Sequence, residues 1–275
     1  MAPTTQAVIL ARGLGTRMRR AGDGAQAHAL TTAQSLAADS GVKGMIPVGR
    51  PFLDYVLSSL ADAGITDAIL VIGEEHEAVR RYFTVTARPE RIRVRFATQA
   101  DPKGTADAVL AAREAVREAP FLVLNSDNYY PSDALRAVAA LGMNGLVAFE
   151  AGTLMRESGL DDERVLQYAL VDFDHDGWLA SIAEKPLPGS PLARRPDRWV
   201  SMNLWSFTPR IFEACARVTV SERGELELQS AVMIAMHDLN ERFRVITARS
   251  GVLDLSRRAD IALVAERLAG IDVRP

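Results

Sequence analysis

Six short segments of the chain carry residue types that bind phosphates, bases and metal ions. The first is a glycine-rich loop, Gly13 to Thr16, which follows the apolar run 7–11 and precedes Arg17. Glycines there let backbone N–H groups approach a phosphate, and a nearby arginine adds charge-assisted hydrogen bonds. Met18 stands where a dinucleotide fingerprint needs its third glycine, and the Gly-Lys-Ser/Thr of a Walker loop is absent from the sequence. The loop therefore predicts either another kind of phosphate site or a structural turn.

The next two segments supply single side chains suited to a nucleotide. Lys43, before the apolar turn 44–48, is either a phosphate ligand or a solvated surface lysine. Gln99 offers a donor and an acceptor together, so it can pair with one edge of a base. Gly104 permits close backbone approach, and Thr105 after it could cap a helix. Residues 99–105 thus indicate either a base-binding turn or a plain strand-to-helix turn.

The remaining segments bring carboxylates. Asp127 follows the apolar run 121–124, and ligands of open α/β sheets bind beyond the carboxyl ends of such strands. Mg²⁺ takes one or two carboxylates plus substrate phosphates, although aspartate is also a common turn former. Asp254 could return a second carboxylate to the metal or cap a helix. Glu184 and Lys185 could hold hydroxyls and a phosphate, or form an exposed ion pair of about 0–1 kcal/mol.

The elements that must position these residues follow from the apolar pattern. Apolar runs at 7–11, 68–72 and 121–124 predict buried strands, and helical patterns at 51–63, 75–82 and 105–118 lie between them. A half-exposed strand is expected at 91–97. Strands alternating with helices predict an α/β fold: a Rossmann-like three-layer α/β/α domain with a mainly parallel mixed sheet. In the second half we expect a hairpin (165–172 and 178–183), a proline-rich loop (187–196), helices at 225–239 and 257–268, and a strand at 243–248.

Composition excludes several classes of function. The 275 residues carry a net charge of −3, which argues against a sequence-independent nucleic-acid binder. A single cysteine, Cys215, excludes a disulfide framework and predicts a protein of the reducing cytoplasm. Neither an apolar stretch of about 18 residues nor a signal-peptide pattern occurs, so we expect no membrane partner.

Taken in order, the six segments resemble the sugar-1-phosphate nucleotidyltransferases, or nucleoside diphosphate-sugar pyrophosphorylases. That family opens with a G-x-G-T-R-M loop and a K-x-x-x-P-V segment. It continues with a Gln five residues before a G-T, a strand ending in a metal-binding Asp, an E-K-P and a late Asp. The resemblance covers residues 7 to 260.

The resemblance implies that an NTP and a sugar 1-phosphate give an NDP-sugar and pyrophosphate, with Mg²⁺ as cofactor. It implies catalytic roles for Arg17, Lys43 and Lys185, metal binding by Asp127 and Asp254, and sugar binding by Glu184 and Asn203. The nucleotide-binding residues would be Leu10, Ala11, Gly13, Gly15, Thr16, Gln99, Gly104 and Thr105. One domain, 1–275, would hold the nucleotide mainly with residues 1–150 and the sugar mainly with 151–275. A homo-oligomer is left open.

The chain also departs from the family pattern. Arg12 replaces a small residue, Asn125 and Ser126 replace the glycine before Asp127, and the late motif lacks the W-x-D-x-G-T form. The segment 18–42 is longer than usual and could form a short helix or a lid. Gln99 with Gly104 favours UTP or dTTP. The alternatives are a non-catalytic regulatory homologue that binds nucleotide-sugar, and an enzyme for a non-sugar alcohol phosphate.

Two other metal patterns are rejected. The segment 172–177 begins like a calcium loop, but its twelfth position is Ala183 rather than Glu, so a tight hairpin turn is expected. The four histidines show no metal-ligand spacing.

Overall fold

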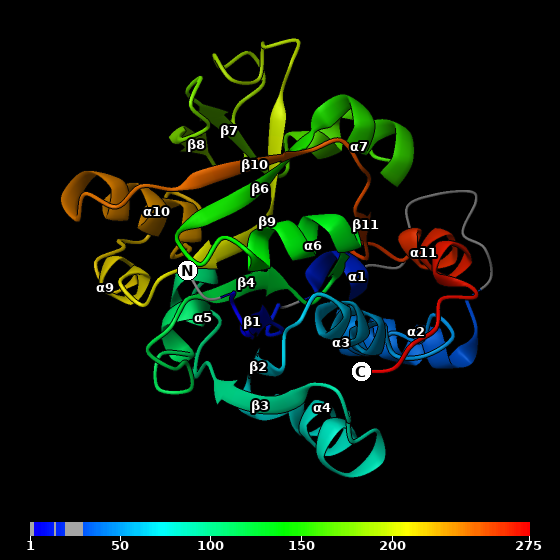
Figure 1. Cartoon of the computed structure of the whole chain (residues 1–275). Helices are drawn as coiled ribbons and strands as arrows, with labels where there is room; N and C mark the ends of the chain where they lie inside the picture. Colours follow the sequence, from blue (N-terminus) through cyan, green and yellow to red (C-terminus); the bar gives the residue numbers. More distant parts are fainter. Residues whose placement is uncertain (1–2, 14, 20–29) are drawn as a thin grey trace.

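The computed structural model describes residues 3–13, 15–19 and 30–275. A mixed sheet crosses the molecule in the order β10-β6-β9-β4-β1-β2-β3, and the hairpin β7-β8 joins it through β9 (Figure 1). The strands are β1 (Gln6–Leu10), β2 (Asp67–Ile72), β3 (Arg93–Thr98), β4 (Phe121–Asn125), β6 (Gly145–Glu150), β7 (Ala169–Phe173), β8 (Leu179–Ala183), β9 (Trp199–Phe207) and β10 (Arg244–Ala248). A separate pair of short strands, β5 (Asn128–Tyr129) and β11 (Leu253–Asp254), runs antiparallel.

The first half of the sheet is parallel, as the alternation of strands and helices predicts. Strand β1 pairs in parallel with β2 and β4, and β2 pairs in parallel with β3. Every residue of β1 and β2 is buried, which is why these strands are apolar runs rather than alternating patterns. Strand β9 is antiparallel to both β4 and β6, so the sheet is mixed. The predicted α/β fold class is confirmed.

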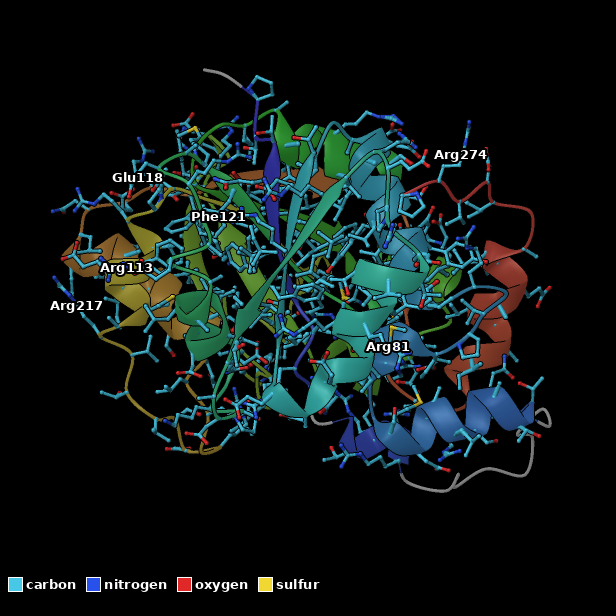
Figure 2. All side chains as sticks on the ribbon, turned by 90° about the horizontal axis from the view of Figure 1, so that it is seen from below. Arg81, Arg113, Glu118, Phe121, Arg217 and Arg274 are labelled. Carbon is cyan, nitrogen blue, oxygen red and sulfur yellow. The ribbon has the colours of Figure 1, made fainter. Side chains whose placement is uncertain are left out.

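Helices cover both faces of this sheet. Side chains of β1 alternate between two cores: Ile9 packs on one face, and Val8 and Leu10 on the other. The first core contains residues of α3 (Phe52–Asp62), α6 (Ser132–Ala139), α7 (Ala151–Ser158) and α11 (Asp260–Leu268). The second contains residues of α5 (Thr105–Ala111), α9 (Ile211–Cys215) and α10 (Leu228–Asp238). Figure 2 shows Arg113, Arg217 and Arg274 extending from the rim of this three-layer body.

The remaining helices are short. They are α1 (Thr16–Arg19), α2 (Thr32–Ser40), α4 (Glu77–Arg81), α8 (Asp162–Val165), two 3₁₀ turns (Lys43–Met45 and Glu74–His76) and a π-helical turn (Tyr82–Thr86). Helix α2 lies in the long segment 18–42 and begins with a capping box between Thr31 and Gln34. The expected short helix is therefore present. The expected lid would include residues 20–29, which lie outside the described residues. None of the described helices has the length and apolar character needed to cross a membrane.

Several predicted element boundaries are wrong. Helix α5 ends at Ala111 instead of continuing to 118: residues 112–116 form turns, and the Gln6 amide binds the backbone from Arg117 onward. Gln6 Nε2 donates to the carbonyls of Arg117 (3.2 Å) and Ala119 (3.0 Å), and its Oε1 accepts from the Arg117 N–H (3.0 Å). Thr105 does not cap α5, since its hydroxyl accepts from the N–H of Leu228 (2.9 Å). The predicted helix at 75–82 is broken into three short turns, and α11 begins at Asp260 rather than 257.

The hairpin prediction is confirmed with shorter strands. Strands β7 and β8 pair antiparallel across the 174–178 turn. Asp174 Oδ1 accepts from the Trp178 N–H at 2.8 Å, and Gly177 has φ +77°. The aspartates of 172–177 therefore close a turn, as expected.

Candidate active site

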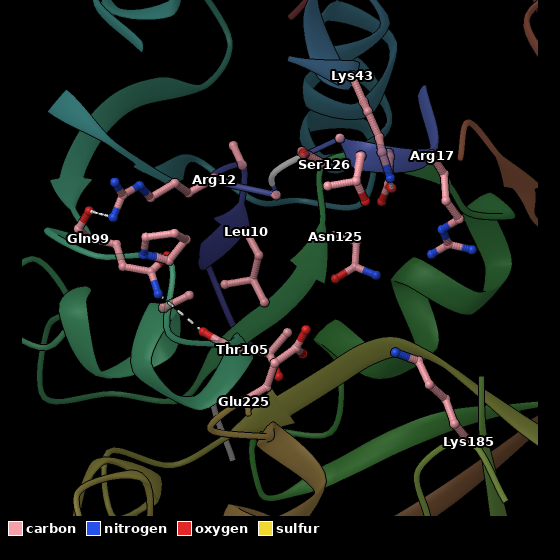
Figure 3. Close-up of a pocket in the computed structure, with 18 residues that line it drawn as sticks. Leu10, Arg12, Arg17, Lys43, Gln99, Thr105, Asn125, Ser126, Lys185 and Glu225 are labelled. Carbon is pink, nitrogen blue, oxygen red and sulfur yellow. Dashed lines mark hydrogen bonds and ion pairs between the residues drawn. The ribbon is translucent and has the colours of Figure 1, made fainter. Parts of the chain in front are cut away.

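A polar pocket opens where β1 and β4 end at their carboxyl edge (Figure 3). It encloses about 340 Å³. The pocket brings together most of the predicted site residues: Leu10, Ala11, Gly13, Gly15, Thr16, Arg17, Lys43, Gln99, Gly104, Thr105, Asp127 and Lys185. Glu184, Asn203 and Asp254 are not among its lining residues. Leu10 and Asn125, which are 115 positions apart in sequence, meet here because the parallel strands β1 and β4 end at one edge of the sheet.

The glycine-rich loop turns sharply between β1 and α1. Gly15 has φ +59°, and a Cβ there would lie 2.3 Å from the carbonyl oxygen of Gly41. The loop can therefore pack against the end of α2 only with glycine at this position. Gly13 has open space around it, so packing does not dictate that glycine.

Lys43 and Asp127 form an ion pair on the pocket wall. Lys43 Nζ lies 2.7 Å from Asp127 Oδ2, with side chains 15% and 16% exposed. The pocket also contains Arg12, Arg17 and Lys185, against one further carboxylate, Glu225. This local excess of cations suits an anionic ligand although the whole chain is slightly acidic.

The Gln99 amide has a fixed orientation. Its Nε2 donates to Asp107 Oδ2 at 2.7 Å and to the Gly104 carbonyl at 3.2 Å. Both partners only accept hydrogen bonds, so the amide nitrogen must face them and Oε1 is left over. Among the residues that the structure describes, none donates a hydrogen bond to that Oε1.

The turn beside Gln99 is tied to the second half of the chain. Gly104 has φ +129°, and a Cβ there would lie 2.4 Å from the Leu226 carbonyl oxygen. The Ala106 N–H donates to that carbonyl at 2.9 Å, and the Leu226 N–H donates to the Lys103 carbonyl at 2.7 Å. Glu225, which lines the pocket, is thereby held next to the Gln99 turn.

Lys185 and Glu184 follow the hairpin strand β8. Lys185 lines the pocket with φ +44°, a conformation rare for residues other than glycine. Glu184 Oε1 lies 3.9 Å from Lys185 Nζ, and its side chain is 18% exposed. Burial raises the pKa of Glu184 to about 7, against the opposing effect of Lys185 and Arg223. Backbone strain and a perturbed carboxyl group at adjacent positions are typical of functional sites.

Asp254 is placed differently from Asp127. Its Oδ1 accepts from Asn128 Nδ2 (3.2 Å) and Ser256 Oγ (2.7 Å). Its Oδ2 accepts from Arg164 Nη2 (2.9 Å) and Tyr168 Oη (2.7 Å). Burial and the nearby Asp127 raise the pKa of Asp254. The alternative helix cap is not observed either, since it is Asp260 that accepts from the N–H groups of residues 256 and 257.

Asn203 lies in β9 at φ +58°, where the pairing of β9 with β6 shifts register. Its Oδ1 accepts from Trp205 Nε1 (3.3 Å) and Gln229 Nε2 (3.1 Å). The bond from Gln229 ties the irregular strand to α10. The contact of Asn203 with a sugar stays a prediction, as does that of Glu184.

Six pocket residues were not predicted as site residues: Arg12, Pro102, Ala108, Asn125, Ser126 and Glu225. Arg12 pairs with Glu75 at 3.2 Å and donates to the Gln99 carbonyl. Asn125 and Ser126 were noted only as departures from a family motif, although polar residues directly after a buried strand are a usable signal. No sequence pattern marked Glu225 as a site residue. It reaches the pocket because the fold packs its neighbour Leu226 against the Gln99 turn.

Comparison with known proteins identifies the family. Residues 6–255 match the family model described as Nucleotidyl transferase. The chain belongs to this family. UTP–glucose-1-phosphate uridylyltransferase AglF of Haloferax volcanii is 28% identical over 228 residues, covering 82% of each chain. Glucose-1-phosphate thymidylyltransferase of Streptomyces antibioticus is 29% identical over 236 residues, covering 82% of this chain and 56% of that relative.

A solved structure supports the fold assignment. A UDP-glucose pyrophosphorylase complexed with UDP-glucose aligns with a TM-score of 0.72 at 16% identity, covering 96% of this chain and 98% of that one. The resemblance to sugar-1-phosphate nucleotidyltransferases is thus confirmed. The chain is an enzyme of this nucleotidyltransferase class.

Proposed function

We propose that this nucleotidyltransferase joins UTP or dTTP to a sugar 1-phosphate, releasing pyrophosphate, with Mg²⁺ as cofactor. The observation that carries the proposal is the pocket itself. It places an oriented Gln99 amide at one end and a cation-ringed Asp127 at the other. The similarity to uridylyl- and thymidylyltransferases supports the choice of nucleotides.

The orientation of Gln99 supports a preference for uracil and thymine over cytosine and adenine. Its Oε1 is an acceptor, and uracil and thymine present a donor, N3–H, between two carbonyl groups. Cytosine N3 and adenine N1 are acceptors, so they would meet this oxygen without a hydrogen bond. A site that leaves a buried polar group unpaired rejects such a ligand.

The remaining chemistry is the approach of two anions. A sugar-phosphate oxygen is already ionised at neutral pH, so no general base is needed. Lys43, Arg17 and Lys185 line the pocket where they would neutralise the triphosphate and the sugar phosphate. Glycine-loop N–H groups would hold the leaving pyrophosphate. Catalysis then consists of positioning and charge stabilisation.

The described residues fit a magnesium ion through one carboxylate. Asp127 faces the pocket with one oxygen paired to Lys43, whereas both oxygens of Asp254 accept bonds from protein donors. Among the described residues there is no group of three or more His, Cys, Asp or Glu side chains that could hold a metal by themselves. Mg²⁺ commonly takes one carboxylate and completes its shell with phosphate oxygens and water. Held by Asp127, it would neutralise phosphate charge during the reaction.

The proposed division of the domain fits the pocket lining. Residues 1–150 contribute the loop, Lys43, Gln99 and Asp127, whereas residues 151–275 contribute Lys185 and Glu225. The first set would bind mainly nucleotide, and the second mainly the sugar phosphate.

A matrix of four NTPs against a panel of sugar 1-phosphates, with pyrophosphate release as readout, tests the proposal. UTP and dTTP should be used in preference to CTP and ATP. The Gln99→Ala variant should lose that base preference by about 10-fold or more while its rate with UTP falls less. An unchanged base profile in this variant would refute Gln99 as the base reader. Absence of pyrophosphate with every pair would refute the function.

A further inference from the structure

A chain of side-chain hydrogen bonds runs from the pocket wall into the buried core. Asn125 Nδ2 donates to Asn128 Oδ1 at 3.1 Å, and Asn128 Nδ2 donates to Asp254 Oδ1 at 3.2 Å. Asn125 lines the pocket, whereas Asn128 and Asp254 are buried at 1% and 7% exposure. The two ends of this chain therefore lie in different environments.

The buried end of this chain of hydrogen bonds is Asp254, whose carboxylate is held as a hydrogen-bond acceptor. Arg164 donates to Asp254 Oδ2 and also to both oxygens of Asp260, at 2.9 and 3.3 Å. A guanidinium can only donate, so Asp254 is held as the acceptor of an ion pair. Arg164 cannot swing away without leaving Asp260 without its cationic partner as well. The Asp254 oxygens are thus saturated by Asn128, Ser256, Arg164 and Tyr168.

The acceptor at Asp254 fixes the orientation of the Asn128 amide and, through it, that of the Asn125 amide. If the Asn128 amide were flipped, its oxygen would face the Asp254 oxygen, so Nδ2 must point to the carboxylate. Asn128 Oδ1 then points to Asn125 and requires a donor there, which is Nδ2 of Asn125. The Oδ1 of Asn125 is left over, and none of the described residues donates to it.

We propose that Asp254 is a positioning residue that acts through Asn128 to orient the Asn125 amide, whose Oδ1 then accepts a hydrogen bond from a substrate hydroxyl. Figure 3 shows Asn125 on the pocket wall between Lys43 and Arg17 on one side and Lys185 and Glu225 on the other. The cations would engage phosphates, so the acceptor among them suits a neutral donor such as a hydroxyl. Both the ribose and the sugar of a sugar 1-phosphate carry that group.

The inference rests on the proposed function, and it assigns Asp254 away from the metal. A second carboxylate ligand needs an available lone pair, whereas the lone pairs of Asp254 are directed to protein donors. The nearby Arg164 charge would also repel a divalent cation.

The first test separates the two possible hydroxyl sources. We would compare kcat/KM for UTP against dUTP, and for glucose 1-phosphate against its 2-, 3- and 6-deoxy analogues, in wild type, Asn125→Ala and Asp254→Asn. Wild type should prefer the hydroxylated substrate on one of these axes by about 10-fold. Asn125→Ala should abolish that preference through KM more than kcat, and Asp254→Asn should reduce it on the same axis. The exposed amide variant Gln167→Ala is the matched control and should keep both preferences.

The second test measures divalent-cation affinity directly, by titrating Mn²⁺ and following its EPR signal in the presence of UTP. Asp127→Asn should weaken Mn²⁺ binding by at least about 10-fold, and Asp254→Asn should stay within about 3-fold of wild type. Equal weakening in both variants would overturn the positioning role, as would unchanged hydroxyl preferences in Asn125→Ala.

Two provisions keep the proposal testable. If Asp254→Asn does not fold, Asn128→Leu breaks the same chain of hydrogen bonds while leaving the ion pair between Arg164 and Asp254 intact. It should show the same loss of preference, and full retention would overturn the proposal. If wild type forms no pyrophosphate, the proposed function fails, and the hydroxyl preference is then read from calorimetric binding of UTP and dUTP and of the sugar phosphates.

Discussion

Asp127 and Asp254 lie on adjoining segments, since the Leu255 N–H donates to the Asp127 carbonyl at 2.8 Å, yet their side chains have opposite surroundings. Asp127 faces the pocket with one amine partner, Lys43. Asp254 is buried with partners on both oxygens. The two carboxylates therefore differ in the number of lone pairs left to solvent, which is the difference on which the proposed roles of Asp127 and Asp254 rest. Sequence spacing does not distinguish the two.

The sharpest way to break this comparison is to remove each carboxylate's cation. Arg164→Met leaves Asp254 and Asp260 buried without their charge partner, so the free energy of unfolding should fall by about 3–5 kcal/mol. Lys43→Met should cost about 1 kcal/mol or less, because Asp127 can be hydrated from the pocket. Urea denaturation of both variants measures the difference. Equal losses would show that the two carboxylates are equally buried in energetic terms.

The next largest effect concerns catalysis. Asp127→Asn removes the one predicted metal-binding carboxylate that faces the pocket, so the rate of pyrophosphate release should fall by about 10²–10³-fold. The thermal unfolding temperature should not change, because the amide fills the same volume and the pocket is open. Near-normal turnover in a folded variant would contradict the assignment of Asp127 as the metal ligand.

A third carboxylate, Glu184, extends the comparison because its burial makes the stability of the protein depend on pH. Burial raises its pKa from 4.5 to about 7, so the folded state holds the proton more tightly than the unfolded state. Stability from this group is present below pH 4.5 and is lost as pH rises through 7. Glu184→Gln should therefore be more stable than wild type at pH 8, by about 2–3 kcal/mol, and should lose this advantage near pH 4.5. Parallel pH–stability curves for the two proteins would contradict the burial argument.

The sequence predicted the parts of the fold that local patterns encode. The buried runs of β1, β2 and β4 were predicted because strands covered on both faces are mostly apolar, and α3 because Leu53, Val56, Leu57 and Leu60 recur at helical spacing. The early end of α5 was not predicted, because residues 112–116 form turns and the segment after them is held by Gln6, 111 positions away from Arg117.

The site shows the same limit. Motif order located the glycine loop, Lys43, Gln99, Asp127 and Lys185 at one pocket. It could not distinguish Asp254 from Asp127, because Arg164 and Tyr168 reach Asp254 from a distant segment. Partners supplied by the fold decide what a carboxylate can do.

The contact between the Gly104 turn and the Leu226 backbone has a mechanical consequence. Two backbone hydrogen bonds join these segments, so the turn that carries Gln99 and the segment that carries Glu225 are held together on one side of the pocket. A bulkier residue at position 104 would push the Gln99 turn and the Leu226 backbone apart. Under the proposed roles of the two segments, nucleotide selectivity and acceptor selectivity would therefore change together.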